Sequence, residues 1–244
     1  MSDSTTATPK KVLIVASNPV VSDQTGWPIG FWWAELTHPY WEFVQRGYEV
    51  TIASPEGGAI TADNFSDPED PSGYSASDIL SLGFKKSATH AALLENTAKL
   101  SDVNVADYDA VMLIGGQGPM YTFKDNAIVN RAIRQFYEAG KPTALVCHAT
   151  CALLDAKGSN GALIVEGKTW TGFSNEEERQ ADAYVGQKIQ PYWIEDEARK
   201  ISGTTFVVGP PFVPFAVQEG NLITGQQQFS GAETARTVIA ALER

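Results

Sequence analysis

The sequence contains few cysteines, few histidines and few basic residues for its length. Cys147 and Cys151 are the two cysteines among 244 residues, and their spacing is not that of a disulfide framework. Lysine and arginine total 18 against 29 acidic residues, so the formal net charge is −11. Such an acidic surface repels phosphate backbones and anionic head groups, which argues against binding to nucleic acid or to a membrane surface.

Long apolar runs are also absent from the sequence. No run approaches the ~20 residues that a membrane span requires. Residues 1–11 are polar, and the apolar run at 12–16 is shorter than a signal-peptide core. The three histidines, His38, His90 and His148, show no metal-ligand spacing with the cysteines. We therefore expect a soluble cytoplasmic protein without a metal or cofactor.

Short β-rich runs alternate along the chain with longer amphipathic stretches. Helices are predicted at 31–47, where Pro39 is expected to kink the helix or delay its start, and at 126–140. This alternation predicts an α/β domain with a parallel sheet and helices on both of its faces. The buried strands are predicted at 10–16, 48–54, 108–116 and 143–147.

Two regions depart from this alternation. Residues 59–98 are rich in Pro, Ser and Asp at first and then in Ala and Leu, which predicts a surface excursion within the domain. The C-terminal third has a weaker pattern. Its predicted elements are a hairpin at 162–170, a helix from Glu176, short strands near Phe206 and Leu222, and a last helix from about Ala232.

Cys147 stands where a predicted strand ends and a helix-compatible stretch, 149–155, begins. A thiol at this position faces the N–H groups of the helix start, which favour the thiolate, and lies at the ligand-binding edge of a parallel sheet. A buried structural cysteine is the alternative for this segment alone. Cys151, one turn further, is interpreted as a packing residue.

Two further segments offer groups that suit acyl or carbonyl chemistry. The glycine turn at 115–118 can aim an N–H group into the crevice as half of an oxyanion site, with a plain tight turn as the alternative. Glu35 lies among aromatic and aliphatic residues. It is either a solvated residue at a helix start or a buried carboxyl whose raised pKa suits acid–base catalysis near neutrality.

Five segments together resemble the ThiJ/PfpI superfamily, and within it the branch of heat-shock chaperones and glutathione-independent glyoxalases (glyoxalase III). The resemblance runs over nearly the whole chain and implies a single domain of this type over 1–244. The implied fold is flavodoxin-like, as in class I glutamine amidotransferases, with a nucleophile elbow at Cys147 and usually a homodimer. The segments are GFWWAELTHPYWEFVQRGYEVTIASPEGG (30–58), VMLIGGQG (111–118), VCHA (146–149), GKTWTGFSNEEE (167–178) and NLITGQQQFS (221–230).

The resemblance also implies roles for individual residues. Cys147 corresponds to the nucleophile, His148 to its neighbouring base, and Glu35 to the carboxyl that hydrogen-bonds the sulfur. The acidic partner of the histidine falls in the NEEE run, at Glu178 with Glu177 in reserve. The amides of Gly116 and His148 are expected to form the oxyanion site.

The implied activity is a glyoxalase III-type lyase (D-lactate dehydratase) that converts methylglyoxal, a small carbonyl substrate, into lactate. Two departures from the branch weaken the substrate assignment: Gln117 stands in place of the usual histidine, and Ala149 in place of a glycine. The alternatives are a holding chaperone or redox sensor, and another cysteine-dependent hydrolase or hydratase of the superfamily.

Overall fold

A seven-stranded sheet forms the centre of the computed structural model, which describes residues 8–244. The strand order is β10-β11-β7-β6-β1-β4-β5, and all neighbours pair in parallel except β10 and β11. The predicted α/β class with a parallel sheet is therefore confirmed. The strands span β1 Lys11–Val15, β4 Glu49–Ser54, β5 Ala98–Lys99, β6 Ala110–Leu113, β7 Thr143–Val146, β10 Ala216–Glu219 and β11 Leu222–Gly225.

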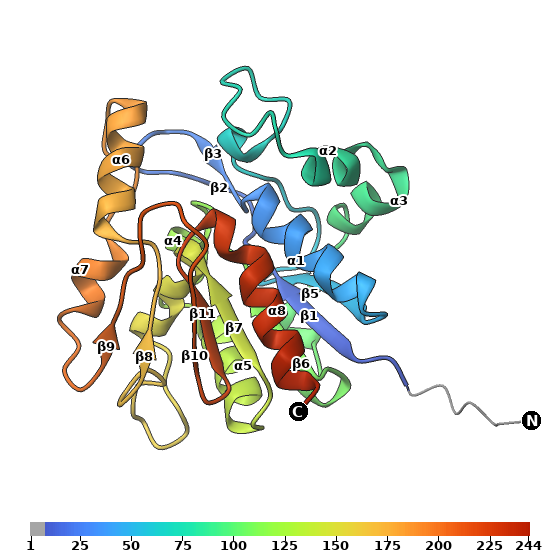
Figure 1. Cartoon of the computed structure of the whole chain (residues 1–244), viewed down its shortest axis with the longest axis vertical. Coiled ribbons are helices and arrows are strands. Elements are labelled where there is room, and N and C mark those ends of the chain that lie inside the picture. The colour runs from blue at the N-terminus through green and yellow to red at the C-terminus, as the bar shows by residue number, and fades with distance from the viewer. Residues whose placement is uncertain (1–7) are drawn as a thin grey trace, which may run out of the picture.

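Helices cover both faces of this sheet (Figure 1). Helices α1 (Trp33–Gln45) and α8 (Gly231–Leu242) pack side by side on one face, and α5 (Ala127–Glu138) covers the other. Pro39 lies inside α1 and does not delay its start. A Cβ at Gly231, the first residue of α8, would lie 3.3 Å from the Pro39 ring, so glycine there allows the two helices to pack closely.

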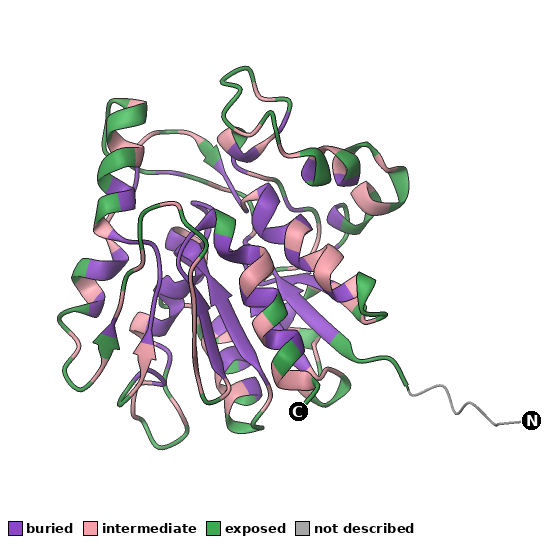
Figure 2. Cartoon of the chain, in the orientation of Figure 1, coloured by how far each residue is buried: buried purple, intermediate pink, exposed green. Residues whose placement is uncertain are grey.

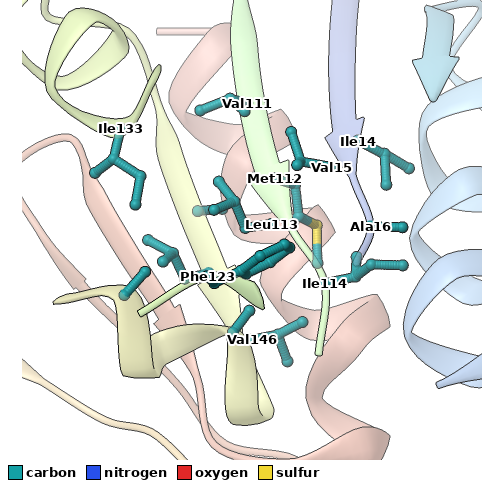
Figure 3. Close-up of a cluster of buried hydrophobic side chains, with 14 of the residues drawn as sticks. Ile14, Val15, Ala16, Val111, Met112, Leu113, Ile114, Phe123, Ile133 and Val146 are labelled. Carbon is teal, nitrogen blue, oxygen red and sulfur yellow. The ribbon is translucent and has the colours of Figure 1, made fainter. Parts of the chain in front are cut away.

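The central strands form the core because nearly every side chain on them is apolar. β6 and β7 are buried along their whole length, which gives the continuous apolar runs expected of a parallel sheet. Figure 3 shows Met112, Leu113 and Val146 of these strands with Phe123 and Ile133 from the helical side. Each such buried side chain contributes about 1.5–3 kcal/mol to folding.

The segment between β4 and β5 is largely exposed, as Figure 2 shows. It contains the short helices η1 (Asn64–Ser66), α2 (Ile79–Lys86), α3 (Ala88–Ala91) and η2 (Ala92–Leu94). It corresponds to the predicted excursion at 59–98, and both its ends return to the sheet edge. Of the described helices, none is long and apolar enough to cross a membrane.

The hairpin predicted at 162–170 is wrong. β8 (Thr169–Trp170) pairs instead in parallel with β9 (Thr205–Phe206), and the preceding Ile164 and Val165 are buried in the core outside any strand. Gly167, at φ 71°, turns the chain, but the residues before and after it do not pair with each other as strands of a hairpin. β9, β11 and α8 lie where short strands and a last helix were predicted.

Most of the remaining elements lie around the carboxyl edge of the sheet or on the far side of β11, whereas the two short 3₁₀-helices that precede β6 lie at its amino end. A two-stranded ribbon precedes α1, and two helices follow β8 at the left of Figure 1. They are β2 Val20–Val21, β3 Pro28–Ile29, η3 Leu100–Asp102, η4 Val105–Asp107, α4 Pro119–Thr122, η5 Cys147–Leu154, α6 Asn175–Val185, α7 Ile194–Ala198 and η6 Gln228–Ser230.

Candidate active site

Cys147 lies at a sharp turn between β7 and the helix η5. Its φ is 57°, in the left-handed region that residues other than glycine seldom adopt and that stores backbone strain. Residues 149–154 of the stretch predicted as a helix at 149–155 belong to η5, which is a 3₁₀-helix and begins at Cys147 itself. The turn points the thiol toward the carboxyl edge of the sheet, where the side chain is buried but lines a cavity.

The turn after β6 lies directly beside this cysteine, because β6 and β7 are paired in register with Leu113 opposite Leu145. A Cβ at Gly115 would lie 2.8 Å from Glu35 Oε2, 2.9 Å from the Cys147 Cβ and 2.9 Å from the His148 amide nitrogen. Real Cβ atoms do not approach other atoms this closely. Glycine at this position is thus what allows the three groups to meet.

Glu35 comes to the same place from the first turn of α1. It is fully buried, and its Oε2 accepts a hydrogen bond of 2.8 Å from the Gly115 amide. Of the two alternatives for Glu35, the structure therefore contains the buried carboxyl. Burial, partly offset by the Cys147 thiol and the Gly115 amide, raises the pKa of Glu35 to about 8.

His148 links the thiol to a second buried carboxyl. Cys147 Sγ lies 3.3 Å from His148 Nδ1, and His148 Nε2 lies 3.0 Å from Glu178 Oε1. The imidazole stacks on the Phe173 ring at a centroid distance of 4.2 Å. If Nε2–H donates to Glu178, the Nδ1 lone pair faces the sulfur. Burial raises the pKa of Glu178, and its interaction with His148 opposes that rise.

Glu177 faces away from the histidine. Its carboxyl forms a capping box with Ser174 at the start of α6 and accepts hydrogen bonds from the Phe212 amide and the Gln226 side chain. Of the two glutamates considered for the histidine, Glu178 is the one in contact with it.

The backbone amides of Gly116 and His148 interact with the Cys147 thiol and lower its pKa. They favour the thiolate, as expected at a helix start. Burial and the neighbouring Glu35 nevertheless raise the pKa of Cys147 well above its usual range. The expectation of a thiolate favoured in the resting protein is therefore wrong. The local sequence indicates the amides but not how completely the sulfur is removed from water.

Asp63 is a buried residue of this site that the sequence analysis missed. Its two carboxyl oxygens accept hydrogen bonds from the Gly30 amide at 2.9 Å and from the Gln117 amide at 2.6 Å. Burial raises its pKa to about 7. In the sequence, Asp63 stands among the polar residues of the excursion, where aspartate is typical of a solvated turn, so no local signal marks it.

Asp63 thereby ties the glycine turn to the segment before α1. Gly118 donates a hydrogen bond to the Gly30 carbonyl, and Trp32 donates one to the Gly115 carbonyl. Gly116 has φ 106°, and a Cβ there would lie 2.6 Å from the backbone of residues 31 and 32. The two backbone segments lie in direct contact, and this contact sets the position of the Gly116 amide.

A cavity of about 240 Å³ opens from the sulfur. Cys147, His148 and Glu178 lie at one end of it together with Gly116 and Gln117. The side-chain oxygen Oε1 of Gln117 is buried and has no hydrogen-bond partner among the described residues. The predicted residues thus meet around a single cavity, except that Glu35, which lies beside Cys147 at the Gly115 turn, does not line the cavity.

The remaining cysteine and histidines lie outside the site. Cys151 is fully buried, its Sγ donates to the Pro119 carbonyl, and burial raises its pKa to about 12, as befits a packing residue. His38 contacts Asp78, and His90 contacts Ser87.

Comparison with known protein families identifies the family of this chain. The model of the DJ-1/PfpI family matches residues 30–241. The chain belongs to the DJ-1/PfpI family. The ThiJ/PfpI resemblance is therefore confirmed.

Several known proteins are similar to this chain over almost its whole length. Glutathione-independent glyoxalase HSP31 of Saccharomyces cerevisiae is 28% identical and covers 96% of this chain and 99% of its own. The crystal structure of glyoxalase III from Candida albicans superposes with a TM-score of 0.78 at 25% identity, over 95% of this chain and 97% of that one. Rapid Encystment Protein 24 kDa of Francisella tularensis superposes with a TM-score of 0.83 at 27% identity, over 96% of this chain and 99% of that one.

In this DJ-1/PfpI family protein, the buried acids make stability depend on pH. The pKa of Glu35 rises from 4.5 to about 8 on folding, so the folded state binds the proton more tightly. The resulting stabilisation is present below about pH 4.5 and is lost as the pH rises to about 8. Asp63, raised from 3.8 to about 7, acts with the same sign.

We therefore expect Glu35→Gln to flatten the decline in the free energy of unfolding between pH 5 and 8. The slope removed is at most about 1.4 kcal/mol per pH unit. Urea unfolding at several pH values measures it. Glu176→Gln is the matched control, because that exposed glutamate has a lowered pKa and is already ionised in this range. Parallel curves for wild type and Glu35→Gln would contradict the assignment of the raised pKa to Glu35.

Proposed function

We propose that this protein is a glutathione-independent glyoxalase that converts methylglyoxal into lactate, with Cys147 as nucleophile. The observation that carries the proposal is the chain of contacts from Cys147 through His148 to Glu178, three residues that line one cavity. The similarity to proteins named glutathione-independent glyoxalase and glyoxalase III supports this activity.

The first step is attack of the sulfur on the aldehyde carbon. His148 accepts the thiol proton through Nδ1, and Glu178 stabilises the resulting imidazolium. The new S–C bond converts the carbonyl into an oxyanion, which the amides of Gly116 and His148 bind. His148 then returns the proton to that oxygen, which yields a neutral hemithioacetal and a neutral imidazole.

The second step moves hydrogen from the aldehyde carbon to the neighbouring carbon. His148 removes the proton from the hemithioacetal carbon, which leaves an enediolate, and the imidazolium delivers a proton to the former ketone carbon. The hydroxyl proton of the hemithioacetal passes to the neighbouring oxygen, so the former aldehyde carbon becomes a carbonyl. The product is a lactoyl thioester, which water hydrolyses to lactate and the free thiol. We assign the proton transfer to His148 rather than to Glu35 because His148 lines the cavity. Protonated Glu35, with its pKa of about 8, stabilises negative charge on the sulfur near neutral pH.

Incubation of the purified protein with methylglyoxal, without glutathione, tests this function. We expect lactate, and D-lactate dehydrogenase reports whether it is the D form that the lyase assignment requires. In D₂O the enediol route incorporates deuterium at the carbon bearing the hydroxyl, whereas direct hydride transfer does not. Failure to form lactate would refute the proposal.

Asp63 is proposed as a positioning residue for the oxyanion site. Asp63→Asn replaces one acceptor oxygen with an NH₂ group that faces an amide N–H, so the glycine turn loses an anchor. We expect kcat to fall roughly ten- to a hundredfold while KM changes little. Asp70→Asn is the control, because Asp70 accepts a single amide hydrogen bond within the excursion that asparagine retains. Equal kcat values for the two variants would refute the role of Asp63.

The holding chaperone receives less support. None of the six tryptophans is an exposed residue, so they do not supply the apolar surface that chaperone binding requires. The homodimer and the cytoplasmic location stay predictions, for which sedimentation equilibrium and cell fractionation are the measurements.

A further inference from the structure

The cavity is much larger and more aromatic than methylglyoxal requires. Its volume is about 240 Å³, and a cavity of about 150 Å³ is enough to hold benzene. Methylglyoxal has a methyl group where the cavity offers space for a ring. Side chains of α6 and of the excursion line the cavity together with Cys147 and His148.

Aromatic side chains from segments far apart in the chain line this space. Tyr74 of the excursion packs edge-on against Trp32 at 5.9 Å and contacts Tyr184 of α6 at 5.6 Å. Phe65, also of the excursion, lies 6.2 Å from Tyr184. On the opposite side Phe173, which stacks on His148, lies 6.4 Å from Phe212. We call the five side chains other than Phe173 the aromatic wall: Trp32, Phe65, Tyr74, Tyr184 and Phe212.

The polar groups of the cavity suit an uncharged ligand. Of the described residues that line it, none is lysine or arginine, and Glu178 is the one carboxylate. A substrate bearing a carboxylate or phosphate would find no counter-charge there. The other polar side chains include four neutral amides, those of Gln117, Gln180, Gln190 and Gln228.

We propose that the preferred substrates are neutral 2-oxoaldehydes with an aryl or bulky apolar substituent, whose ring lies against the aromatic wall while the aldehyde meets Cys147. This inference rests on the proposed function and goes further by naming the substituent. A phenyl ring buries more apolar surface in the cavity than a methyl group does. The larger buried surface favours binding and conversion of the aryl substrate over methylglyoxal.

The first measurement compares kcat/KM for phenylglyoxal and methylglyoxal. We expect phenylglyoxal to be at least about tenfold better. Intrinsic reactivity also differs between the two aldehydes, so a variant that changes only the shape of the cavity is needed. Ala181→Phe places a ring on α6 within the cavity lining. It should lower kcat/KM for phenylglyoxal about tenfold or more and leave that for methylglyoxal within about threefold.

Ala183→Phe is the matched control, because Ala183 lies on the same helix, is exposed and does not line the cavity. It should leave both substrates unchanged. Retained methylglyoxal turnover in Ala181→Phe also shows that the variant folds. If methylglyoxal is converted and phenylglyoxal is no better, or if Ala181→Phe affects both equally, the substituent preference is overturned and the glyoxalase function stands.

A binding measurement separates the two proposals if neither aldehyde is converted. Biacetyl and its analogue with phenyl in place of one methyl group have no aldehyde hydrogen and cannot yield a hydroxy acid. Calorimetry with Cys147→Ala should show at least about tenfold tighter binding of the phenyl diketone. Tighter binding without turnover would refute the glyoxalase function alone, whereas equal binding would overturn the assignment of the aromatic wall.

Discussion

Replacing Cys147 with serine is expected to reduce lactate formation from methylglyoxal by about a thousandfold or more. A serine hydroxyl is a far weaker nucleophile than a thiol and is harder to ionise. The amides at Gly116 and His148 stay in place, so binding of the substrate should change much less than its conversion. The loss is therefore expected in kcat, with KM altered by a small factor.

Coupled detection of D-lactate under saturating methylglyoxal measures this effect. Cys151→Ser is the control, because that thiol donates a single hydrogen bond to the Pro119 carbonyl, which a hydroxyl also makes. Its activity should stay within about twofold of wild type, provided the fold is retained by circular dichroism. Undiminished turnover in Cys147→Ser would end the nucleophile assignment and with it the proposed mechanism.

The second large effect is expected from a single methyl group at Gly115. In Gly115→Ala the new Cβ lies under 3 Å from Glu35 Oε2, from the Cys147 Cβ and from the His148 amide. The His148 amide is backbone and the Cys147 Cβ is fixed directly to it, which leaves little room for relief, so Glu35 or the Cys147 turn must move. We expect a loss of about 1–3 kcal/mol in the free energy of unfolding. We also expect a fall in kcat of about a hundredfold, because the sulfur and its amides no longer align.

Gly83→Ala provides the matched control on the same fold. Gly83 is exposed in α2, and a Cβ there meets nothing within 4 Å. Alanine should therefore stabilise the protein by about 0.4–1 kcal/mol through the unfolded state and leave turnover unchanged. Urea unfolding and steady-state kinetics of both variants make the comparison. A Gly115→Ala protein as stable and active as Gly83→Ala would show that the close approach at residue 115 is not needed.

The sheet and its reactive edge were predictable because they depend on local patterns. Continuous apolar runs predict buried parallel strands, and the strand that ends at Cys147 places the thiol at the carboxyl edge. The family resemblance, rather than spacing, singled out Glu178. The side chain of Glu177 is held in the capping box with Ser174 and is not available to His148. This difference between the two glutamates depends on contacts with distant residues such as Phe212.

Other features of the site depend on contacts between segments far apart in the chain. Asp63 and Gln117 are 54 positions apart, and neither neighbourhood indicates the hydrogen bond between them. The aromatic wall joins the start of α1, the excursion, α6 and the loop after β9. The raised pKa of Cys147 reflects complete burial beside Glu35, which no local pattern reports.

The position of Asp63 at the base of the excursion has a consequence for protein engineering. The same segment supplies the hydrogen bonds that hold the glycine turn and, a few residues later, the rings of Phe65 and Tyr74 that face the cavity. If the excursion of another member of the fold is grafted into this chain from the residue after Ser66 onward, Asp63 is retained and Tyr74 is replaced. Libraries of variants built with that junction can change the size and lining of the cavity while the catalytic residues and the glycine turn stay unchanged.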